Sequence, residues 1–167
     1  MYHFLSGYTA KLAGTEAGMG SDPVPEFSAC FGSPFLPLAP RVYAEMLGER
    51  LKQHQSACWL VNTGWSGGAY GTGQRMPIQH TRTLLRAVLD GSLAQAQFHA
   101  DPVFGLMIPS GVPDIPDDVL DPRQAWTDKA AYDRTARELA ARFEANFATF
   151  QEGVSEDVKA SAIRAAA

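Results

Sequence analysis

The chain has 167 residues, of which 46% are hydrophobic and 19% are charged, and its formal net charge at pH 7 is -4. This length accommodates about one domain with a sizeable core, and the composition is ordinary for a globular chain. The mild acidity and the lack of a basic stripe argue against a nucleic-acid partner or an anionic membrane surface. No apolar run approaches the roughly 20 residues that cross a bilayer, so we expect no membrane span.

The first part of the chain mixes short elements with a long connection. Met1 to Ser6 is too short to nucleate an independent element, and Thr9 to Leu12 is a candidate strand. Ala13 to Glu26 is poor in apolar residues and rich in glycine and proline, and a structureless connection of that length is usually functional or disordered. Phe27 to Leu38 contains small and apolar residues with two prolines, which indicates a buried irregular connection.

A helix and a strand are predicted next. Pro40 opens a helix whose apolar face is expected to comprise Tyr43, Met46, Leu47 and Leu51. The continuous apolar run from Cys58 to Val61 predicts a strand buried in a sheet. Cys30 and Cys58 lack Cys-x-x-Cys spacing and are expected to be buried free thiols.

A glycine-rich loop follows this strand and leads into a second helix, begun by Pro77. The loop holds Gly64, Gly67, Gly68, Gly71 and Gly73. Glycine has no side chain and accepts positive φ, so such a loop lets the backbone approach a ligand closely, while a helix N-terminus presents free N–H groups. No Gly-Lys-Ser/Thr follows these glycines, so a Walker-type phosphate loop is excluded here.

Three side chains at this junction are candidates for binding a purine. Arg75 stands before the helix, Met76 follows it, and Thr81 lies about one turn into the helix. A guanidinium can stack on a flat ring, and a hydroxyl can read the ring's polar edge. The alternative is a surface arginine beside a mobile loop.

The remaining elements are predicted from periodicity. The helix after Pro77 is expected to end at Asp90-Gly91 and to bury Ile78, Leu84, Leu85, Val88 and Leu89. Strands are expected within residues 96–99 and 103–108, followed by an irregular crossing from Pro109 to Pro122. The aspartates of that crossing, Asp114, Asp117 and Asp118, fit a solvated turn better than a metal site.

The final helix has the clearest periodic pattern. We expect Thr127 to cap it and the helix to extend to Phe150, with one buried stripe formed by Tyr132, Ala136, Leu139, Phe143 and Phe147. Gly153 should separate it from a tail that is alanine-rich, helix-prone and frayed. The alternation of helix, strand, loop and helix along the chain favours an α/β fold.

The sequence gives little support for a metal site or a nucleophile within this chain. The histidines His3, His54, His80 and His99 share no metal-ligand spacing with a cysteine or a carboxylate. The serines Ser6 and Ser28 lack the G-x-S-x-G pattern of a nucleophile. Ser66 lies in GWSGG, which has that spacing, but a long glycine loop follows it instead of a helix, so the context of a nucleophile is missing there too. We therefore expect no catalytic residue and no metal ligand in this chain.

Four sequence blocks together resemble the C-terminal portion of ATP-dependent phosphoenolpyruvate carboxykinase. They are YHFLSGYTAKLAGTE at residues 2–16, FSACFGSPFLPL at 27–38, WLVNTGWSGG at 59–68 and GQRMPIQHTR at 73–82. The resemblance implies an α/β fold that forms part of the family's C-terminal nucleotide-binding domain, with a mixed sheet and flanking helices. It implies that residues 1–152 form this segment and residues 153–167 a tail.

The resemblance also assigns parts to the segment. It implies a lid loop at about residues 7–26, in which Lys11, Thr15 and Glu16 are the polar groups, an adenine-binding loop and helix at 62–90, and a C-terminal helix at about 128–150. Arg75, Met76 and Thr81 fall on the family's adenosine-contacting positions. Gln74 stands where many relatives carry a lysine, and Ala39 where many carry a histidine, so those charges are absent.

The family converts oxaloacetate and ATP to phosphoenolpyruvate, ADP and CO2 in gluconeogenesis, with magnesium on ATP and manganese or magnesium at a second position. Its phosphate loop, metal ligands and oxaloacetate-binding residues lie upstream of this segment, so the resemblance implies a chain that is inactive alone. Its expected partners are a nucleotide and the missing upstream segment, in the cytoplasm. The alternative is a truncated, non-catalytic remnant that binds nucleotide or associates with a partner chain.

Overall fold

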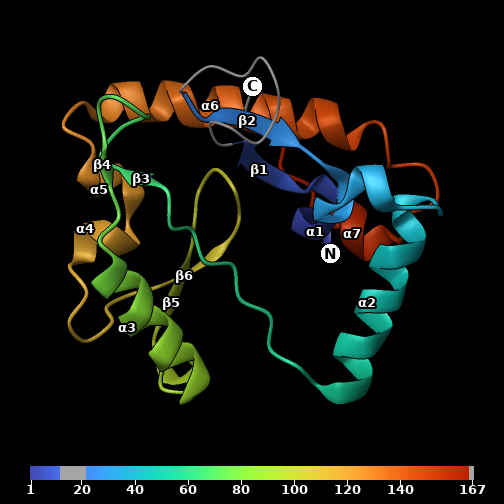
Figure 1. Cartoon of the computed structure of the whole chain (residues 1–167), viewed down its shortest axis with the longest axis horizontal. Coiled ribbons are helices and arrows are strands. Elements are labelled where there is room, and N and C mark those ends of the chain that lie inside the picture. The colour runs from blue at the N-terminus through green and yellow to red at the C-terminus, as the bar shows by residue number, and fades with distance from the viewer. Residues whose placement is uncertain (12–21, 166–167) are drawn as a thin grey trace. The chain divides into compact units, whose positions relative to one another are not determined.

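The computed structural model describes residues 1–11 and 22–165 (Figure 1). These residues form two compact units. Unit 1 comprises Met1–Cys58 and Leu139–Ala165, and unit 2 comprises Trp59–Glu138, so the division falls within the longest helix. The expected combination of helices and sheet is confirmed, in the form of two-stranded antiparallel sheets.

Unit 1 contains four helices and one hairpin. In chain order they are α1 (Tyr2–Ser6), β1 (Tyr8–Lys11), β2 (Val24–Phe27), two short 3-10 turns (Ala29–Phe31 and Ser33–Phe35), α2 (Pro40–His54), the C-terminal part of α6 (Lys129–Phe147) and α7 (Glu156–Ala160). The predicted helix from Pro40 is thus confirmed, and the candidate strand at residues 9–12 corresponds to β1, with Leu12 outside the described residues.

The core of unit 1 is aromatic and is organised around Phe143 of α6, which is only 2% exposed. The ring of Phe143 lies 5.2 Å from Tyr8 and 5.1 Å from Phe27, measured between centroids, and Phe147 lies 5.0 Å from Tyr2. The apolar stripe predicted for the final helix therefore packs as expected at these positions. Large rings dominate because each buries a wide apolar surface.

The hairpin β1–β2 has a tightly specified base. Tyr8 pairs with Phe27 and Lys11 pairs with Val24, and the Nζ atom of Lys11 lies 2.9 Å from a carboxylate oxygen of Glu26. Gly7, which ends α1, has φ 55°, and a Cβ atom there would overlap the carbonyl group of Ser28. Gly7 is therefore restricted to glycine by conformation and by space. The expected lid lies on this hairpin, but its residues 12–21, with Thr15 and Glu16, lie outside the described residues.

Three predictions for unit 1 are wrong in detail. The connection at residues 27–38 is not buried, since Phe31 is 55% and Phe35 86% exposed. On α2 the small residue Ala44 is buried, whereas Met46 is 53% exposed. The tail is not frayed through residue 165, because it forms α7 and buries Val154 and Ile163.

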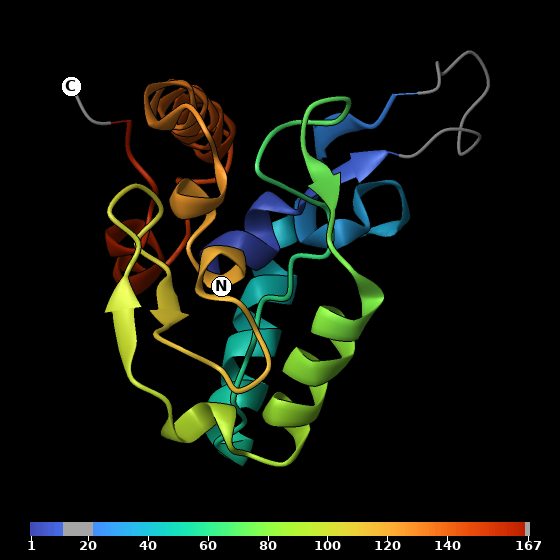
Figure 2. The same cartoon turned by 90° about the vertical axis from the view of Figure 1, so that its left-hand side faces the viewer.

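Unit 2 combines short strands with α3 and the start of α6, and it holds all three tryptophans of the chain, Trp59, Trp65 and Trp126. Its elements are β3 (Trp65–Ser66), β4 (Gln74–Arg75), α3 (Ile78–Leu89), a 3-10 turn (Leu93–Gln95), β5 (Phe98–Ala100), β6 (Met107–Pro109), α4 (Asp117–Leu120), α5 (Pro122–Ala125) and the start of α6. Figure 2 shows β5 and β6 running in opposite directions, with His99 opposite Ile108.

The core of unit 2 lies beside α3. Ala87 of α3 and Leu93, Val112 and Ile115 of the following segments form a buried cluster, against which Trp59, Leu84 and Val88 pack, among other partly buried residues. The predicted end of α3 at Asp90-Gly91 is confirmed, since Gly91 has φ 80°. Of the predicted apolar face, Leu84 and Val88 pack as expected, whereas the prediction is wrong for Ile78, Leu85 and Leu89, which are 63%, 43% and 85% exposed.

Four further predictions need correction. Cys58–Val61 does not form a strand. The segment from Pro109 to Pro122 is not wholly irregular, because it contains α4. The cap of α6 is Asp128 rather than Thr127, since Asp128 Oδ1 accepts a hydrogen bond from the N–H of Ala131 at 2.9 Å. The helix predicted to reach Phe150 ends at Phe147.

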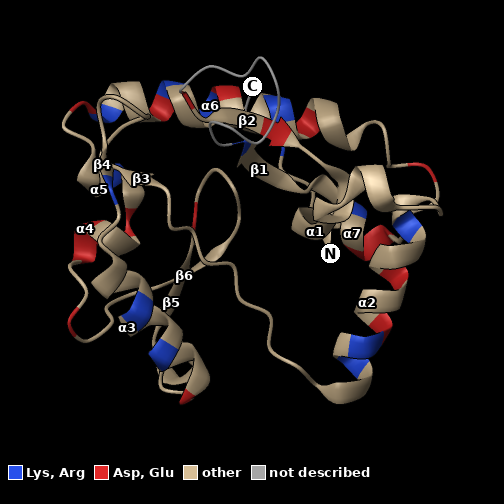
Figure 3. Ribbon diagram, in the orientation of Figure 1, with Lys and Arg blue, Asp and Glu red and all other residues tan. Residues whose placement is uncertain are grey.

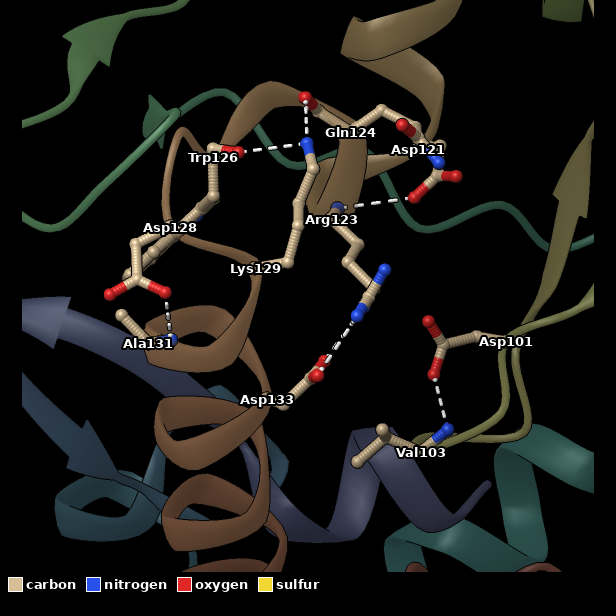
Figure 4. Close-up of polar contacts among 10 residues, drawn as sticks. All are labelled: Asp101, Val103, Asp121, Arg123, Gln124, Trp126, Asp128, Lys129, Ala131 and Asp133. Atoms are coloured by element: carbon tan, nitrogen blue, oxygen red, sulfur yellow. Dashed lines mark hydrogen bonds and ion pairs between the residues drawn. The ribbon is translucent and has the colours of Figure 1, made fainter.

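Polar contacts hold the connection between α5 and α6 (Figure 4). Arg123 donates two hydrogen bonds to the carboxylate of Asp133, from Nε at 2.8 Å and from Nη2 at 3.0 Å. These hydrogen bonds lower the pKa of Asp133. Asp121 caps α5 by accepting from the N–H of Arg123 at 3.1 Å. The fork of a guanidinium fits a carboxylate in this bidentate manner, which fixes direction as well as distance.

The charge pattern agrees with the expectations drawn from composition. Acidic and basic side chains are interspersed along α6, and the connection between α2 and β3 carries no charge (Figure 3). Within residues 1–11 and 22–165, no helix is both long and apolar enough to cross a membrane.

Candidate functional site

The candidate site is built on the hairpin β3–β4, which closes the glycine-rich loop. Trp65 pairs with Arg75 and Ser66 pairs with Gln74, so the two strands bring the ends of the loop together. The N–H groups of Thr72 and Gly73 both donate to the carbonyl of Ala69, at 3.0 and 2.7 Å. The predicted loop is therefore an ordered turn rather than an open connection.

Gly73 is essential to this turn. A Cβ atom at Gly73 would overlap the carbonyl group of Gly68 and come within 2.8 Å of the carbonyl oxygen of Ser66. Because both neighbours are backbone atoms, a side chain would force the hairpin apart. The glycine at this position thus allows two backbone segments to approach each other closely.

Arg75 lies beside an aromatic pair. Its Cζ atom is 5.8 Å from the centroid of the Trp65 ring, and Tyr70 meets Trp65 edge-on with centroids 5.2 Å apart and planes at 86°. Trp65 is half-buried, whereas Arg75 and Tyr70 are exposed. The guanidinium is thus placed by a cation–π contact and stays accessible to a ligand.

Met76 and Thr81 belong to the same continuous segment. The N–H of Met76 donates to the carbonyl of Gly64 at 3.0 Å, which ties the exit of the hairpin to its entrance. Pro77 then begins α3, and Thr81 is half-buried in its first turn. The structure therefore places Arg75 on β4, Met76 between β4 and α3, and Thr81 on α3, all within unit 2.

His80 lies beside Thr81 in the same turn. It is half-buried, and its Nδ1 atom is enclosed without a hydrogen-bond partner among the residues that the structure describes. Burying a ring nitrogen without a hydrogen-bond partner costs free energy, so the position of this imidazole in the first turn of α3 is energetically unfavourable. His80 is not one of the residues predicted to bind a ligand.

The sequence analysis missed two residues of this site, Trp65 and Tyr70. A signal was present, because these two aromatic residues flank Gly67 and Gly68 in the string WSGGAY. Recognising the contact of Trp65 with Arg75 requires the hairpin register, in which the two residues are directly opposite, and Tyr70 joins the site through its contact with Trp65. Cross-strand neighbours of this kind are close enough for aromatic and long side chains to touch.

The described residues contain no cluster of metal ligands, and the two cysteines are not paired. In residues 1–11 and 22–165, no group of three or more His, Cys, Asp or Glu side chains is arranged to hold a metal ion. Asp114, Asp117 and Asp118 are exposed. Both cysteines are free, as predicted, but Cys58 is exposed and Cys30 is only half-buried, so the expectation of two buried thiols was wrong.

Comparisons with known proteins agree on one family. The family model described as phosphoenolpyruvate carboxykinase matches residues 1–118. The chain is 58% identical, over 162 residues, to the phosphoenolpyruvate carboxykinase (ATP) of Bradyrhizobium sp. (strain BTAi1) and to that of Rhodopseudomonas palustris (strain BisB5), and in both cases the match covers 97% of the chain and 30% of the relative. It is 57% identical to the protein of the same name from Nitrobacter hamburgensis, with 100% of the chain and 31% of the relative covered.

The chain therefore spans about 30% of the length of the curated relatives that it matches. The identity is high over almost the whole chain, which establishes the family. The strands, the glycine loop and the helix around Arg75 lie within residues 1–118, the range that the family model matches. The chain belongs to the phosphoenolpyruvate carboxykinase (ATP) family.

Proposed function

We propose that this chain supplies adenine recognition to an ATP-dependent phosphoenolpyruvate carboxykinase, through Arg75, Met76 and Thr81. The observation that carries the proposal is the position of Arg75, exposed at the end of an ordered glycine turn and held over Trp65 at 5.8 Å. A guanidinium supported in this way can stack on a purine with little loss of conformational freedom.

Each residue has a distinct role in this proposal. Arg75 contributes a planar cation to one face of the base, and Met76 contributes an adaptable apolar contact. Thr81 is half-buried in the first turn of α3, and its hydroxyl is the group that would pair with a polar edge of the base. In the first turn of α3 the N–H groups of His80 and Thr81 donate to the carbonyl of Pro77, so only the N–H groups before them, at the very start of the helix, are offered to a ligand.

The reaction of the whole enzyme is part of the proposal. It is the conversion of oxaloacetate and ATP to phosphoenolpyruvate, ADP and CO2, assisted by magnesium and manganese. Phosphoryl transfer depends on cations placed around the phosphates. The described residues offer no donor cluster that fits those metal ions, and the sequence has no Gly-Lys-Ser/Thr, so the phosphates and metals require residues from the rest of the polypeptide. We therefore expect the chain to be inactive alone.

The lid stays a prediction from the family resemblance. Its proposed tip at residues 12–21 lies outside the described residues, while the base is the hairpin β1–β2 of unit 1, fixed by Gly7 and by the Lys11–Glu26 ion pair. A lid of this kind would exclude water from the reacting phosphates. The cytoplasmic location also stays a prediction.

Calorimetric titration of the purified chain tests the proposed function. Adenosine and ATP should bind with similar affinity, because the proposed contacts are made to the base and the sequence has no Gly-Lys-Ser/Thr that would hold the phosphates. A large preference for ATP over adenosine, or no binding of either, would contradict the proposal. In a coupled assay the chain should form no phosphoenolpyruvate from oxaloacetate and ATP.

A further inference from the structure

A tyrosine in the glycine-rich turn contacts the ring that supports Arg75. Tyr70 meets Trp65 edge-on, with ring centroids 5.2 Å apart and planes at 86°. Tyr70 is nevertheless 49% exposed, so the fold gains only part of what burying a tyrosine ring can contribute. The contact between the two rings therefore points to the site beside them rather than to the core of unit 2.

The backbone around Tyr70 forms a tight turn whose shape depends on the next residue. The carbonyl of Ala69 accepts hydrogen bonds from the N–H groups of Thr72 and Gly73, which leaves Tyr70 and Gly71 at the tip. Gly71 has φ 86°, and a positive φ at this place in a turn favours glycine. A Cβ atom there would have no neighbour within 4 Å, so the requirement for glycine comes from the backbone conformation and not from lack of space.

The hairpin β3–β4 carries the position of this tip on to Arg75. Trp65 and Arg75 are directly opposite each other, and the Cζ atom of Arg75 lies 5.8 Å from the centroid of the Trp65 ring. An aromatic neighbour restricts the orientations that an indole can adopt. Because Tyr70 and Arg75 both contact this indole, a change at the turn reaches the guanidinium through two contacts in series.

We propose that Tyr70 is a positioning residue for adenine recognition. Its edge-on contact holds the Trp65 ring in the orientation that supports the guanidinium of Arg75, so the cation is in place before a purine binds. Ordering a side chain before binding removes that cost from the affinity. Tyr70 itself does not touch the base. This inference rests on the proposed function and adds to it the turn that preorganises its cation.

Calorimetric titration of adenosine into variants of the purified chain tests this role. Tyr70→Ala removes the ring and should raise the Kd about 2- to 5-fold, because a partly exposed aromatic pair lies at the lower end of the range for such contacts. Tyr70→Phe keeps the ring and removes only the hydroxyl, so it should bind adenosine within about 1.5-fold of the unmodified chain.

Two glycine variants test the contribution of the turn. Gly71→Ala should weaken adenosine binding by a similar factor, because alanine disfavours the positive φ and the tip that carries Tyr70 changes shape. Gly105→Ala is the matched control. Gly105 also has a positive φ, of 65°, and an open space around its Cβ position, but it lies between β5 and β6. This substitution should leave the Kd for adenosine unchanged.

Circular dichroism separates a positioning role from a general loss of structure. The tryptophan bands in the near ultraviolet should weaken in Tyr70→Ala but not in Tyr70→Phe, because an indole that is less restricted gives a weaker signal. The far-ultraviolet spectrum should stay the same in both variants. In a chain that already carries Trp65→Leu, Tyr70→Ala should change the tryptophan bands no further.

Four results would overturn the inference and leave the proposed function standing. They are unchanged adenosine binding by Tyr70→Ala, unchanged tryptophan bands in that variant, equal weakening by Tyr70→Phe and Tyr70→Ala, and a double variant of Tyr70→Ala with Arg75→Ala that binds more weakly than Arg75→Ala alone. The last result would show that Tyr70 touches the ligand itself. Failure of the unmodified chain to bind adenosine would refute the proposed function and, with it, the role of Tyr70.

Discussion

Replacing Trp65 with leucine should weaken adenosine binding, although Trp65 is not one of the residues proposed to contact the base. In the structure its ring supports Arg75, whose Cζ atom is 5.8 Å from the ring centroid. Leucine keeps an apolar side chain at this half-buried position but removes the aromatic face. Arg75 would then have to be ordered by the ligand itself, and the affinity would fall by the cost of that ordering.

The size of the effect follows from the geometry. The distance is close to the limit of about 6 Å for a cation–π contact, and the pair is partly exposed, so the contact contributes about 0.5–1 kcal/mol. Trp65→Leu should therefore raise the Kd for adenosine about 2- to 5-fold. Arg75→Ala removes both the support and the stacked cation, so it should raise the Kd by more, up to about 30-fold for a loss of 2 kcal/mol.

Calorimetric titration of the two single variants and the double variant completes a cycle. If Trp65 acts only through Arg75, the double variant should bind adenosine no more weakly than Arg75→Ala alone. Arg86→Ala, which removes one positive charge in the last turn of α3, serves as the control and should leave the Kd unchanged. Additive effects of the two substitutions would refute the supporting role of Trp65, and an unchanged Kd for Arg75→Ala would remove Arg75 from the site.

Three predictions concern the free energy of unfolding of unit 1. It is measured by chemical denaturation, monitored by circular dichroism, and by amide hydrogen exchange. Gly7→Ala should destabilise unit 1 by at least about 1–3 kcal/mol, because of the positive φ of Gly7 and the overlap of a Cβ atom with a carbonyl group. The control Gly32→Ala should cost little, because Gly32 has φ -154° and the nearest atom lies 3.9 Å from a Cβ placed there. Equal effects of the two substitutions would contradict this prediction. Phe143→Ala should cost about 3–5 kcal/mol and Phe35→Ala, at 86% exposure, less than about 0.5 kcal/mol, and a reversed order would show that the aromatic core is misassigned. Burial, with a smaller contribution from the N-terminal charge, lowers the pKa of His3, so below the unfolded pKa of about 6.5 the unfolded state binds more protons and stability should fall as the pH decreases. His3→Gln should reduce that fall between pH 7 and 5, and an identical pH dependence in both proteins would be evidence against it.

The helices were predictable from sequence where the periodic signal was long. The stripe containing Phe143 and Phe147 repeats at helical spacing over several turns, and both residues are buried in α6. The faces of α2 and α3 were misassigned for a common reason. Counting large apolar residues overlooks alanine, yet Ala44 and Ala87 are the buried residues of these helices, because a small side chain permits the closest approach to a neighbouring element.

The strand predicted at Cys58–Val61, which does not form, illustrates a different limit. Its composition is that of a buried strand, but a strand requires a partner backbone, and none pairs with it among the described residues. The candidate site shows the same dependence on pairing. Arg75 could be proposed from its position before a helix, whereas its contact with Trp65 depends on the register of β3 and β4, which the sequence pattern does not specify.

The placement of Trp59, Trp65 and Trp126 in one unit makes the chain its own spectroscopic reporter. Tryptophan fluorescence reports on the unfolding of unit 2 alone, whereas far-ultraviolet circular dichroism reports on the helices of both units. Comparing the two signals during a thermal ramp would show, without any label, whether the halves of α6 melt together or in sequence.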